Sequence, residues 1–598
     1  MIEHYDILNI KEVIYHRNLK KAAKFLRKHL YLILITFCIL AISKLADSWD
    51  GSYNNTDGYT RLIRVKNWLL NPSFREQKFF ISNYPFGEVL NWTRPNDFLW
   101  LIMSLVFFNH FNIEDALFLG GAFLSPLLYL GTICCLGYGL RRHFNVWLTL
   151  LGGILFLANN IITNEFSFYS ANHHSFMILL LFYTYSSLLC WLKKREKRYL
   201  SGGAFALGLA TFVSLNGIVF ATAFLGYFLY LYIIKNVSLT HVRKFFLDYT
   251  IFITIFLALN PTFDGYFTIT HGRLSFLFVA ISWIMVVALY VLDYFHIHTK
   301  KLKITSLLCA GSICALIIII LFGKDIFTNL IKKVENNIWE HQKLTSSPFY
   351  NNSMLIIIKY YLMNFIALLV NIYLLIYRVQ KEHKKILLLN LLVGGIVFIY
   401  SLYSINFVQY TPLFEILPWL CLIDKIYKTS DYYISKSGKF PTQIYAIILS
   451  IVFIYSLTPT TLTDNIKPKT NFYSPILIAK IKNIGGTLLT DAFLSTRYVF
   501  EANVNTVSTP YNSNIDGITD GIDILFSEND EISFSLAQRH HVTQILLFKE
   551  YANSFYNMED KNRNKLYWRL LNNERIPYFL EKVPTDNLNY HLYKIKNY

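Results

Sequence analysis

The sequence is short of charged residues, which make up 16% of its 598 positions, against about a quarter in average soluble domains. This deficit excludes a disordered chain and a single soluble globule, because both rely on charged side chains for solvation. Cysteine is scarce as well, and all seven cysteines lie inside apolar runs, which excludes a disulfide-held secreted scaffold. P-loop, GxSxG and paired metal-ligand motifs are missing, which counts against an ATP-driven pump. A polytopic membrane protein remains.

The net charge of +18 is divided among short basic clusters that separate the apolar stretches. This distribution is typical of short cytoplasmic loops and predicts topology, with no nucleic-acid partner. The clusters are KKAAKFLRKH before the first apolar stretch, RRH at 141–143, KKREKR at 193–198, HVRK at 241–244, HTKK at 298–301, KEHKK at 381–385 and the lysines of 425–439.

The apolar stretches predict roughly thirteen membrane spans, each needing about 17–25 residues. The first (29–46) follows a basic start and has no clear cleavage site, which indicates an uncleaved signal anchor. Two long stretches are divided, near Asn216-Gly217 and near Asn406, because the division keeps every basic cluster on one side. The other spans centre near residues 127, 152, 184, 207, 226, 252, 284, 313, 365, 395, 414 and 450.

An odd number of spans and a cytoplasmic N-terminus place the C-terminal region outside the cytoplasm. We therefore predict a transmembrane domain at 1–460 and an extracytoplasmic α/β domain at 461–598. The second domain is predicted from β-branched runs (GGTLLT, VNTVST, VTQILLF) that alternate with helical stretches (EISFSLAQRH, NRNKLYWRLL). The topology also predicts long extracytoplasmic loops at about 47–114 and 324–352, and a shorter one at about 160–175.

The first loop offers a candidate catalytic carboxylate. Asp57 and Arg61 are spaced i, i+4, so they share a face if the segment is helical. A carboxylate just outside the membrane can take a proton from an acceptor while a lipid phosphate departs at the same depth. On these residues alone, the simpler interpretation that Asp57 caps a helix is favoured.

Two further loops carry polar candidates. Glu165, His173 and His174 could bind a divalent cation or a phosphate, although adjacent histidines diverge on most backbones. An interfacial histidine pair without a ligand is the favoured interpretation here. Glu340 and His341 lie in the segment NNIWEHQKLTSSPFYNN and are a weak signal alone.

Together these features resemble the C-type glycosyltransferases, in particular the catalytic subunit of oligosaccharyltransferase and its bacterial relatives. The sequence DGYTRL at 57–62 resembles the first-loop acidic motif of that family, and PFGEVLNWTRPNDF resembles a Pro-x-Gly…Trp-Ser/Thr-Arg…Asp segment. YSANHHSF aligns with the second-loop motif, and IWEHQ at 338–342 is similar to the late-loop motif, with Glu340 at its acidic position. VSTPYNSNIDGITDG resembles a Pro-Tyr-His-Arg-Asn stretch of the soluble domain.

The sequence also departs from the family pattern. Asn172 stands where the second-loop Asp is expected, and an amide cannot balance the charge of a metal ion as a carboxylate does. Asn406, in NFVQY, stands where relatives have an Arg that would meet the lipid phosphate. A Trp-Trp-Asp motif is missing, which argues against an Asn-x-Ser/Thr acceptor in protein.

The resemblance implies the thirteen-span fold of these enzymes and an inverting glycosyltransferase that uses a polyprenyl-phosphate or pyrophosphate sugar donor. Its implied partners are membrane lipid, that donor, and a glycan, lipid or protein acceptor. Asp57 would be the general base, Arg61 would orient it, and Arg94 or Lys66 would contact phosphate. The other implied substrate-binding residues are His173, His174, Glu340, His341 and Tyr410, and the implied ligands of a Mg or Mn ion are Asp57, Glu165 and His173.

Two alternatives stay open. The Asn replacements favour a catalytically silent lipid-glycan translocator or assembly scaffold, and a glycan polymerase or ligase would differ only in its acceptor. A bias toward Ile, Lys, Asn and Tyr suggests an AT-rich genome and a bacterial inner membrane.

Overall fold

The computed structural model divides the chain into two compact units. It describes residues 45, 52–53, 56–73, 78–90, 92–234, 236–295, 299–335, 354–377, 381–437, 473–511, 514–549, 563–585, 587 and 589–596. Among these, the helical unit comprises Leu45, 123–259 and 266–437, and the mixed unit comprises 52–122, 260–265 and 473–596.

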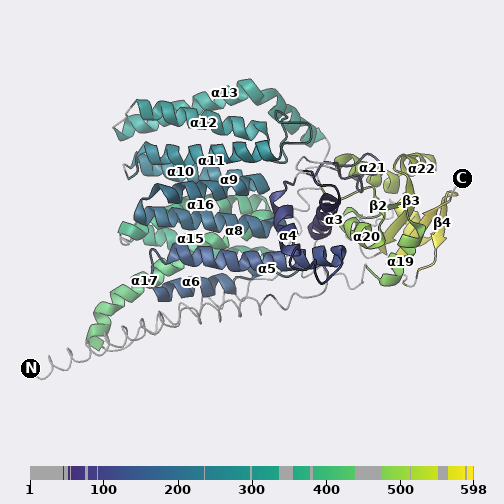
Figure 1. The fold of residues 1–598 in the computed structure, drawn as a ribbon, viewed down its shortest axis with the longest axis horizontal. Coiled ribbons are helices and arrows are strands. Elements are labelled where there is room, and N and C mark those ends of the chain that lie inside the picture. Colours follow the sequence, from purple (N-terminus) through teal and green to yellow (C-terminus); the bar gives the residue numbers. More distant parts are fainter. Residues whose placement is uncertain are drawn as a thin grey trace, which may run out of the picture. The chain divides into compact units, whose positions relative to one another are not determined.

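The helical unit consists of apolar helices joined mainly by short connections (Figure 1). Along one edge α9, α11, α12 and α13 pack side by side, each against the next. The helices are α5 (Ile113–Leu140, whose start belongs to the mixed unit), α6 (Val146–Ala158), α7 (Asn160–Glu165), α8 (His173–Lys194), α9 (Lys197–Val213), α10 (Asn216–Ile233), α11 (Leu239–Leu259), α12 (Phe276–Tyr294), α13 (Lys300–Glu335), α15 (Met354–Ile376), α16 (Lys381–Tyr403), the 3₁₀ helix η1 (Ile405–Tyr410) and α17 (Pro412–Ser437).

The predicted span centres from 127 to 414 each fall inside one of these helices. Both predicted divisions are confirmed, because α9 ends at Val213 before α10 begins at Asn216, and η1 separates α16 from α17. Of the predicted span 29–46 only Leu45 is described, and the span near 450 and the domain boundary at 461 lie outside the described residues. The loop predicted at 324–352 begins as helix instead, because α13 continues to Glu335.

Six helices in the described part of the chain are long and apolar enough to cross a membrane, so the count of thirteen is not confirmed. They differ in burial. In α8, 83% of the most apolar stretch is buried, whereas in α13 that share is 0%. Exposed side chains such as Ile319, Ile320 and Leu321 would be costly in water but suit contact with lipid. The protein is an integral membrane protein with α8 inside the bundle and α13 at its edge.

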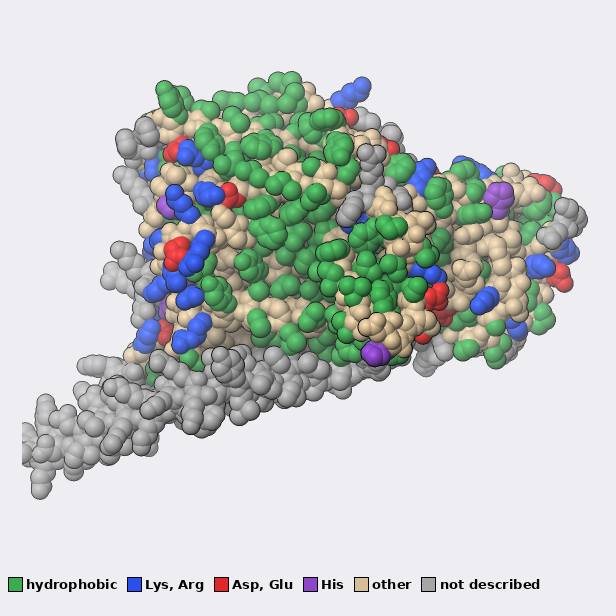
Figure 2. All heavy atoms as spheres, viewed as in Figure 1, with side chains coloured by type: hydrophobic (Ala, Val, Ile, Leu, Met, Phe, Trp, Pro, Cys, Tyr) green, Lys and Arg blue, Asp and Glu red, His purple; other side chains and the backbone are tan. Residues whose placement is uncertain are grey.

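Lysine and arginine side chains gather at one end of the helical unit, beyond a wide apolar band (Figure 2). Contacts between helix ends agree with this view. Arg243 near the start of α11 binds Asp293 near the end of α12 at 2.7 Å, and Lys303 near the start of α13 donates to the carbonyl of Tyr232 at 3.0 Å. The prediction that the basic clusters share one side is consistent with this arrangement.

The mixed unit contains a five-stranded sheet with the order β2-β1-β3-β5-β4. β1 pairs in parallel with β2 and β3, while β5 pairs antiparallel with β3 and β4. The strands are β1 (Thr487–Leu489), β2 (Asn505–Thr506), β3 (Val542–Phe548), β4 (Leu580–Val583) and β5 (Tyr590–Ile595). The first three lie in the three runs from which strands were predicted, so the small α/β fold is confirmed.

Both faces of this sheet are covered. In β3, Ile545 and Leu547 enter one apolar cluster, while Leu546 and Phe548 enter the other, as the period of two in a strand requires. Helices α19 (Pro475–Ile484) and α20 (Ala492–Ala502) cover the second cluster. Helices α21 (Ile515–Phe526), α22 (Asp530–Arg539) and α24 (Leu566–Asn572) cover the first.

The first predicted loop forms part of this same unit. Its helix α3 (Thr56–Leu70) packs against α20, and Ile63 and Val499 share an apolar cluster. A second helix, α4 (Pro95–Ser104), packs against α3. The loop backbone also bonds to the strand region, because the amide of Thr506 donates to the carbonyl of Ile81 at 2.8 Å.

Candidate functional site

Asp57 lies in the first turn of α3, where a carboxylate is favoured by the helix dipole. The hydroxyl of Tyr511 donates to Asp57 Oδ1 at 3.1 Å and lies 2.9 Å from Thr60 Oγ1. Burial raises the pKa of Asp57, and the opposing effects of the Arg61 charge and the Tyr511 hydrogen bond are smaller. Burial and the neighbouring carboxylate raise the pKa of Tyr511 well above its usual value, so this hydroxyl stays a donor. A carboxylate with a raised pKa and a fixed donor has the properties of a general base.

One buried carboxylate organises the arginines beside Asp57. Arg61 Nη1 lies 3.0 Å from Asp97 Oδ1, Arg64 Nε lies 3.0 Å from Oδ2, and Arg94 Nη1 lies 3.4 Å from Oδ2. Asp97 is fully buried (0% exposed). Arg61 therefore lies one turn from Asp57, as its spacing predicts, but its ion pair is with Asp97. Burial lowers the pKa values of Arg61 and Arg64, and that of Arg94 to about 10.

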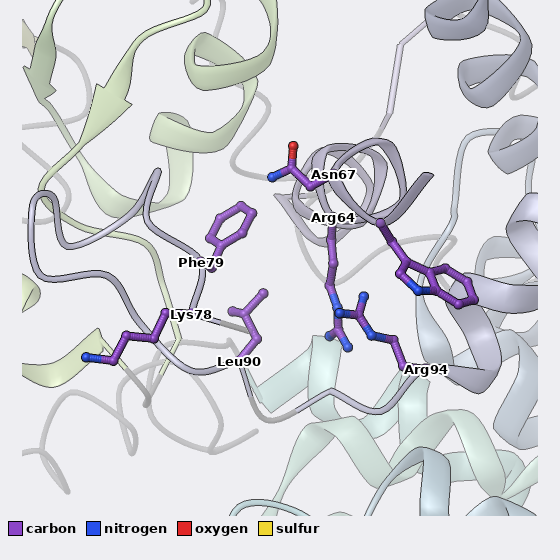
Figure 3. A pocket seen from close by; sticks show the side chains of 7 residues that line it. Arg64, Asn67, Lys78, Phe79, Leu90 and Arg94 are labelled. Carbon is purple, nitrogen blue, oxygen red and sulfur yellow. The ribbon is translucent and has the colours of Figure 1, made fainter. Parts of the chain in front are cut away.

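A hollow opens beside these arginines, with the Arg64 and Arg94 side chains directed toward one another (Figure 3). Arg64 also donates from Nη2 to the carbonyl of Trp92 at 2.7 Å. Lys66, the other predicted phosphate contact, does not line this hollow and instead pairs with Glu114 at the surface. The residues that line it are Arg64, Asn67, Trp68, Lys78, Phe79, Leu90 and Arg94.

The helical unit contains the second group of candidates. Asn172 caps α8, because its side chain accepts from the backbone amides of His174 and Ser175 at 3.0 and 3.2 Å. The same side chain donates to Glu165 Oε2 at 2.9 Å. An Asp at this position could form the cap but could not donate to Glu165. The hydrogen bond to Glu165 is therefore a structural reason for an amide at position 172.

The histidine pair differs from expectation. The rings of His173 and His174 lie 4.1 Å apart between centroids, so they do not diverge. His174 Nδ1 lies 3.0 Å from the Tyr410 hydroxyl and 2.6 Å from Gln409 Nε2. Two of the predicted substrate-binding residues, His174 and Tyr410, are thus brought together although they lie far apart in the sequence.

The three predicted cation ligands are divided between the two units. Glu165 and His173 belong to the helical unit and Asp57 to the mixed unit, and Glu165 already accepts the Asn172 amide. Among the described residues there is no group of three or more His, Cys, Asp or Glu side chains that could hold a metal ion.

Some predicted site residues lie outside the described part of the chain, and two residues of the site are not predicted from the sequence. Glu340 and His341 lie outside the described residues, as does the side chain of Asn406. Asp97 and Tyr511 lie in the segments that resemble family motifs, but the sequence predicts no role for either. The signal for Asp97 was the density of arginines around it in a chain with little charge, because buried arginines need a carboxylate.

The chain shares its fold with solved structures of an archaeal oligosaccharyltransferase. Among solved structures, the chain is similar to the archaeal oligosaccharyltransferase AglB from Archaeoglobus fulgidus in complex with an inhibitory peptide and a dolichol-phosphate. That comparison has a TM-score of 0.71 and 12% identity, and it covers 93% of this chain and 80% of the other.

Two more structures of the Archaeoglobus fulgidus oligosaccharyltransferase are similar. One is tethered to an acceptor peptide with the NVT sequon (TM-score 0.64, 12% identity, 96% of this chain and 75% of the other covered). The other is a complex with Zn and sulfate (TM-score 0.59, 12% identity, 88% and 69% covered). No protein-family model and no curated protein matches the chain. At these identities the similarity establishes the fold.

Proposed function

We propose that the protein is an inverting membrane glycosyltransferase. It moves a sugar or glycan from a polyprenyl-phosphate or pyrophosphate donor to an acceptor on the extracytoplasmic face. The observation that carries the proposal is Asp57, a carboxylate with a raised pKa and a hydroxyl partner in a chain with this fold. A neighbour of the same fold was solved with a dolichol-phosphate, which supports a lipid-linked donor.

In the proposed reaction, Asp57 accepts the proton of the acceptor nucleophile. The nucleophile forms a bond to the anomeric carbon as the bond from that carbon to the phosphate oxygen breaks, with inversion. The lipid phosphate leaves with the electron pair. Phosphate is a good leaving group, so positioning and electrostatics supply most of the rate. The fixed Tyr511 hydroxyl holds the Asp57 carboxylate in one orientation.

Other residues bind the two substrates in this proposal. His174 and Tyr410 already share a hydrogen bond, and with His173 they would contact the donor phosphate. Arg61 would orient Asp57, and Arg94 would meet an anionic group. Glu340 and His341 would position the acceptor from the late loop. No step in this reaction is assigned to a cation.

The proposed orientation in the membrane is based on the end of the helical unit where lysine and arginine side chains gather. That end would face the cytoplasm, with the N-terminus, as positively charged loops do. The C-terminal domain, proposed to extend over 461–598 after a transmembrane domain at 1–460, would lie outside the cytoplasm. The membrane would be a bacterial inner membrane.

The test combines native mass spectrometry with one substitution. The purified chain in mild detergent is expected to carry a polyprenyl-phosphate sugar that disappears when candidate acceptors are added. In Asp57→Asn the lipid-linked sugar is expected to persist. Asp115→Asn is the matched control, because Asp115 is exposed and pairs only locally with Asn112. If no lipid-linked sugar binds to the wild-type chain, or if Asp57→Asn transfers normally, the proposal is wrong.

A silent translocator or assembly scaffold is the second candidate. The Asn172–Glu165 hydrogen bond favours it, because this amide occupies a carboxylate that could otherwise serve a ligand. Under this alternative Asp57→Asn leaves biological function unchanged. The mass of the product, rather than mutagenesis, would separate a transferase from a glycan polymerase or ligase.

A further inference from the structure

The hollow beside α3 is lined by an uneven set of charges. Among the described residues that line it, Arg64, Arg94 and Lys78 are cationic, Asn67 carries an amide, and none is a carboxylate. Arg64 and Arg94 are each only 7% exposed, whereas Lys78 lies at the exposed rim. Its empty volume is about 380 Å³, including space open to solvent.

The charges around it are not balanced by the described residues. Asp97 contacts three guanidinium groups, Asp57 acts on Arg61, and the buried carboxylate of Glu88 accepts from the Thr509 hydroxyl. Arg64 and Arg94 therefore share the remaining half of one carboxylate, Asp97 Oδ2, at 3.0 and 3.4 Å. Buried positive charge without a matching anion is costly, because the low-dielectric surroundings do not solvate it.

Two donors of these arginines are also unused. Arg64 Nη1 and Arg94 Nε are buried and have no hydrogen-bond partner among the residues that the structure describes. They belong to different guanidinium groups that point toward one another (Figure 3). A planar carboxylate is best matched by two donors of one guanidinium, whereas a tetrahedral oxyanion can accept from separate groups in different directions.

We infer that this hollow binds a phosphate group. Arg64 Nη1 and Arg94 Nε donate to its oxygens. Lys78, whose ammonium lies 6.0 Å from the centre of the Phe263 ring, adds a longer-range positive charge, and the Asn67 amide lies at the edge of the hollow. Phe79 and Leu90 provide an apolar wall against which the organic part of a phosphate ester can lie. The inference does not depend on sugar transfer, and it names a site separate from the base Asp57, which does not line the hollow.

The position on the helix gives the site a functional context. Asp57, Arg61 and Arg64 follow the spacing i, i+4, i+7, so they form one stripe on α3. At 1.5 Å per residue, Arg64 lies about 10 Å along the axis from Asp57. A bound phosphate would therefore lie on the same face of the helix as the candidate base, about two turns away.

The experiment is titration calorimetry on the full chain in a non-ionic detergent. The probes are inorganic phosphate, inorganic pyrophosphate, geranyl phosphate and acetate. The variants spare the buried ion pairs: Lys78→Ala removes the rim charge, and Asn67→Asp places a carboxylate in the hollow. Lys66→Ala is the matched control, because it removes a lysine of the same unit that does not line the hollow.

We expect the phosphate probes to bind and acetate not to bind. Lys78→Ala should weaken phosphate binding by about five-fold and Asn67→Asp by about ten-fold or more, whereas Lys66→Ala should change it by less than about two-fold. Geranyl phosphate binding at least ten-fold tighter than inorganic phosphate would assign the site to a lipid-linked or other organic ester. Equal affinities would assign it to the phosphate group alone, and both results support the site.

The inference is overturned if no phosphate probe binds, if acetate binds equally, or if Lys66→Ala weakens binding as much as Lys78→Ala. A chain that binds phosphate as described but transfers no sugar would contradict the proposed function and leave this site intact. If the chain transfers sugar but Lys78→Ala and Asn67→Asp do not change phosphate binding, the phosphate site is contradicted and the proposed function is supported.

Discussion

Asp97→Asn tests whether one carboxylate holds the first loop together. Asp97 is fully buried and accepts from three arginines at 3.0, 3.0 and 3.4 Å. The substitution keeps the shape of the side chain but removes the anion that the three buried guanidinium groups share. Breaking a buried ion pair by removing one partner costs about 3–5 kcal/mol. Since 1.4 kcal/mol is a factor of ten, we expect the local opening equilibrium to rise by about 100- to 4,000-fold.

The assay is hydrogen–deuterium exchange of the full chain, followed in peptides that cover α3 (Thr56–Leu70) and α4 (Pro95–Ser104). Exchange reports local opening, which suits a chain with two units better than a single melting temperature. Glu114→Gln is the control, because Glu114 pairs with Lys66 at the surface and such pairs contribute about 0–1 kcal/mol. Loss of less than about ten-fold protection in α3 and α4 would refute the reasoning.

Three further predictions concern single hydrogen bonds and charges. Asp57→Asn should stabilise the chain at pH 7.5 but not below pH 4, because a raised folded-state pKa means that stability is lost as pH rises through it; melting curves at the two values check this. Tyr511→Phe should move the acidic limb of the pH–rate profile to higher pH. The Tyr511 hydrogen bond lowers the pKa of Asp57, so its removal raises that pKa; Tyr578→Phe, at an exposed hydroxyl, is the control. Asn172→Asp should destabilise the chain by placing two carboxylates together, and Mn²⁺ should restore its melting temperature more than that of the wild type; equal Mn²⁺ effects would contradict this.

Local patterns were enough to predict most of the helices. Apolar length gave the helix centres, and the requirement that basic clusters share one side gave the breaks at Asn216-Gly217 and near Asn406. Three strands were predicted from β-branched runs, but β4 and β5 were missed. β4 reads LEKV and β5 reads YHLYKI, so polar residues interrupt both, and their strand character comes from pairing with β3 and with each other.

The site was harder to predict because its contacts are distant in sequence. Asp57 and Tyr511 are 454 positions apart, and His174 and Tyr410 are 236 apart. Spacing rules apply within one helix or strand, so they indicated the Asp57–Arg61 stripe but not the carboxylate that pairs with Arg61. The same limit applies to the packing of α3 on α20, which joins the first loop to the C-terminal region within one unit.

The ion pair between Arg61 and Asp97 influences the pKa of Asp57. Arg61 lies one turn from Asp57, and its charge alone would lower the pKa of that carboxyl. Burial has the larger effect on Asp57, and the opposite charge of Asp97, 3.0 Å from Arg61 Nη1, offsets part of the effect of Arg61. In Asp97→Asn the Arg61 charge is no longer offset by Asp97, so it should lower the pKa of Asp57 more strongly.

We therefore expect the acidic limb of the pH–rate profile to move to lower pH in Asp97→Asn, opposite in direction to Tyr511→Phe. Rates normalised to their maximum make the comparison independent of how much of the destabilised variant is folded. Glu114→Gln should leave the limb in place. A shift in the same direction for both variants would show that Arg61 and Tyr511 do not control the candidate base. Opposite shifts would show that the buried arginine cluster tunes the charge of Asp57 as well as holding α3 in place.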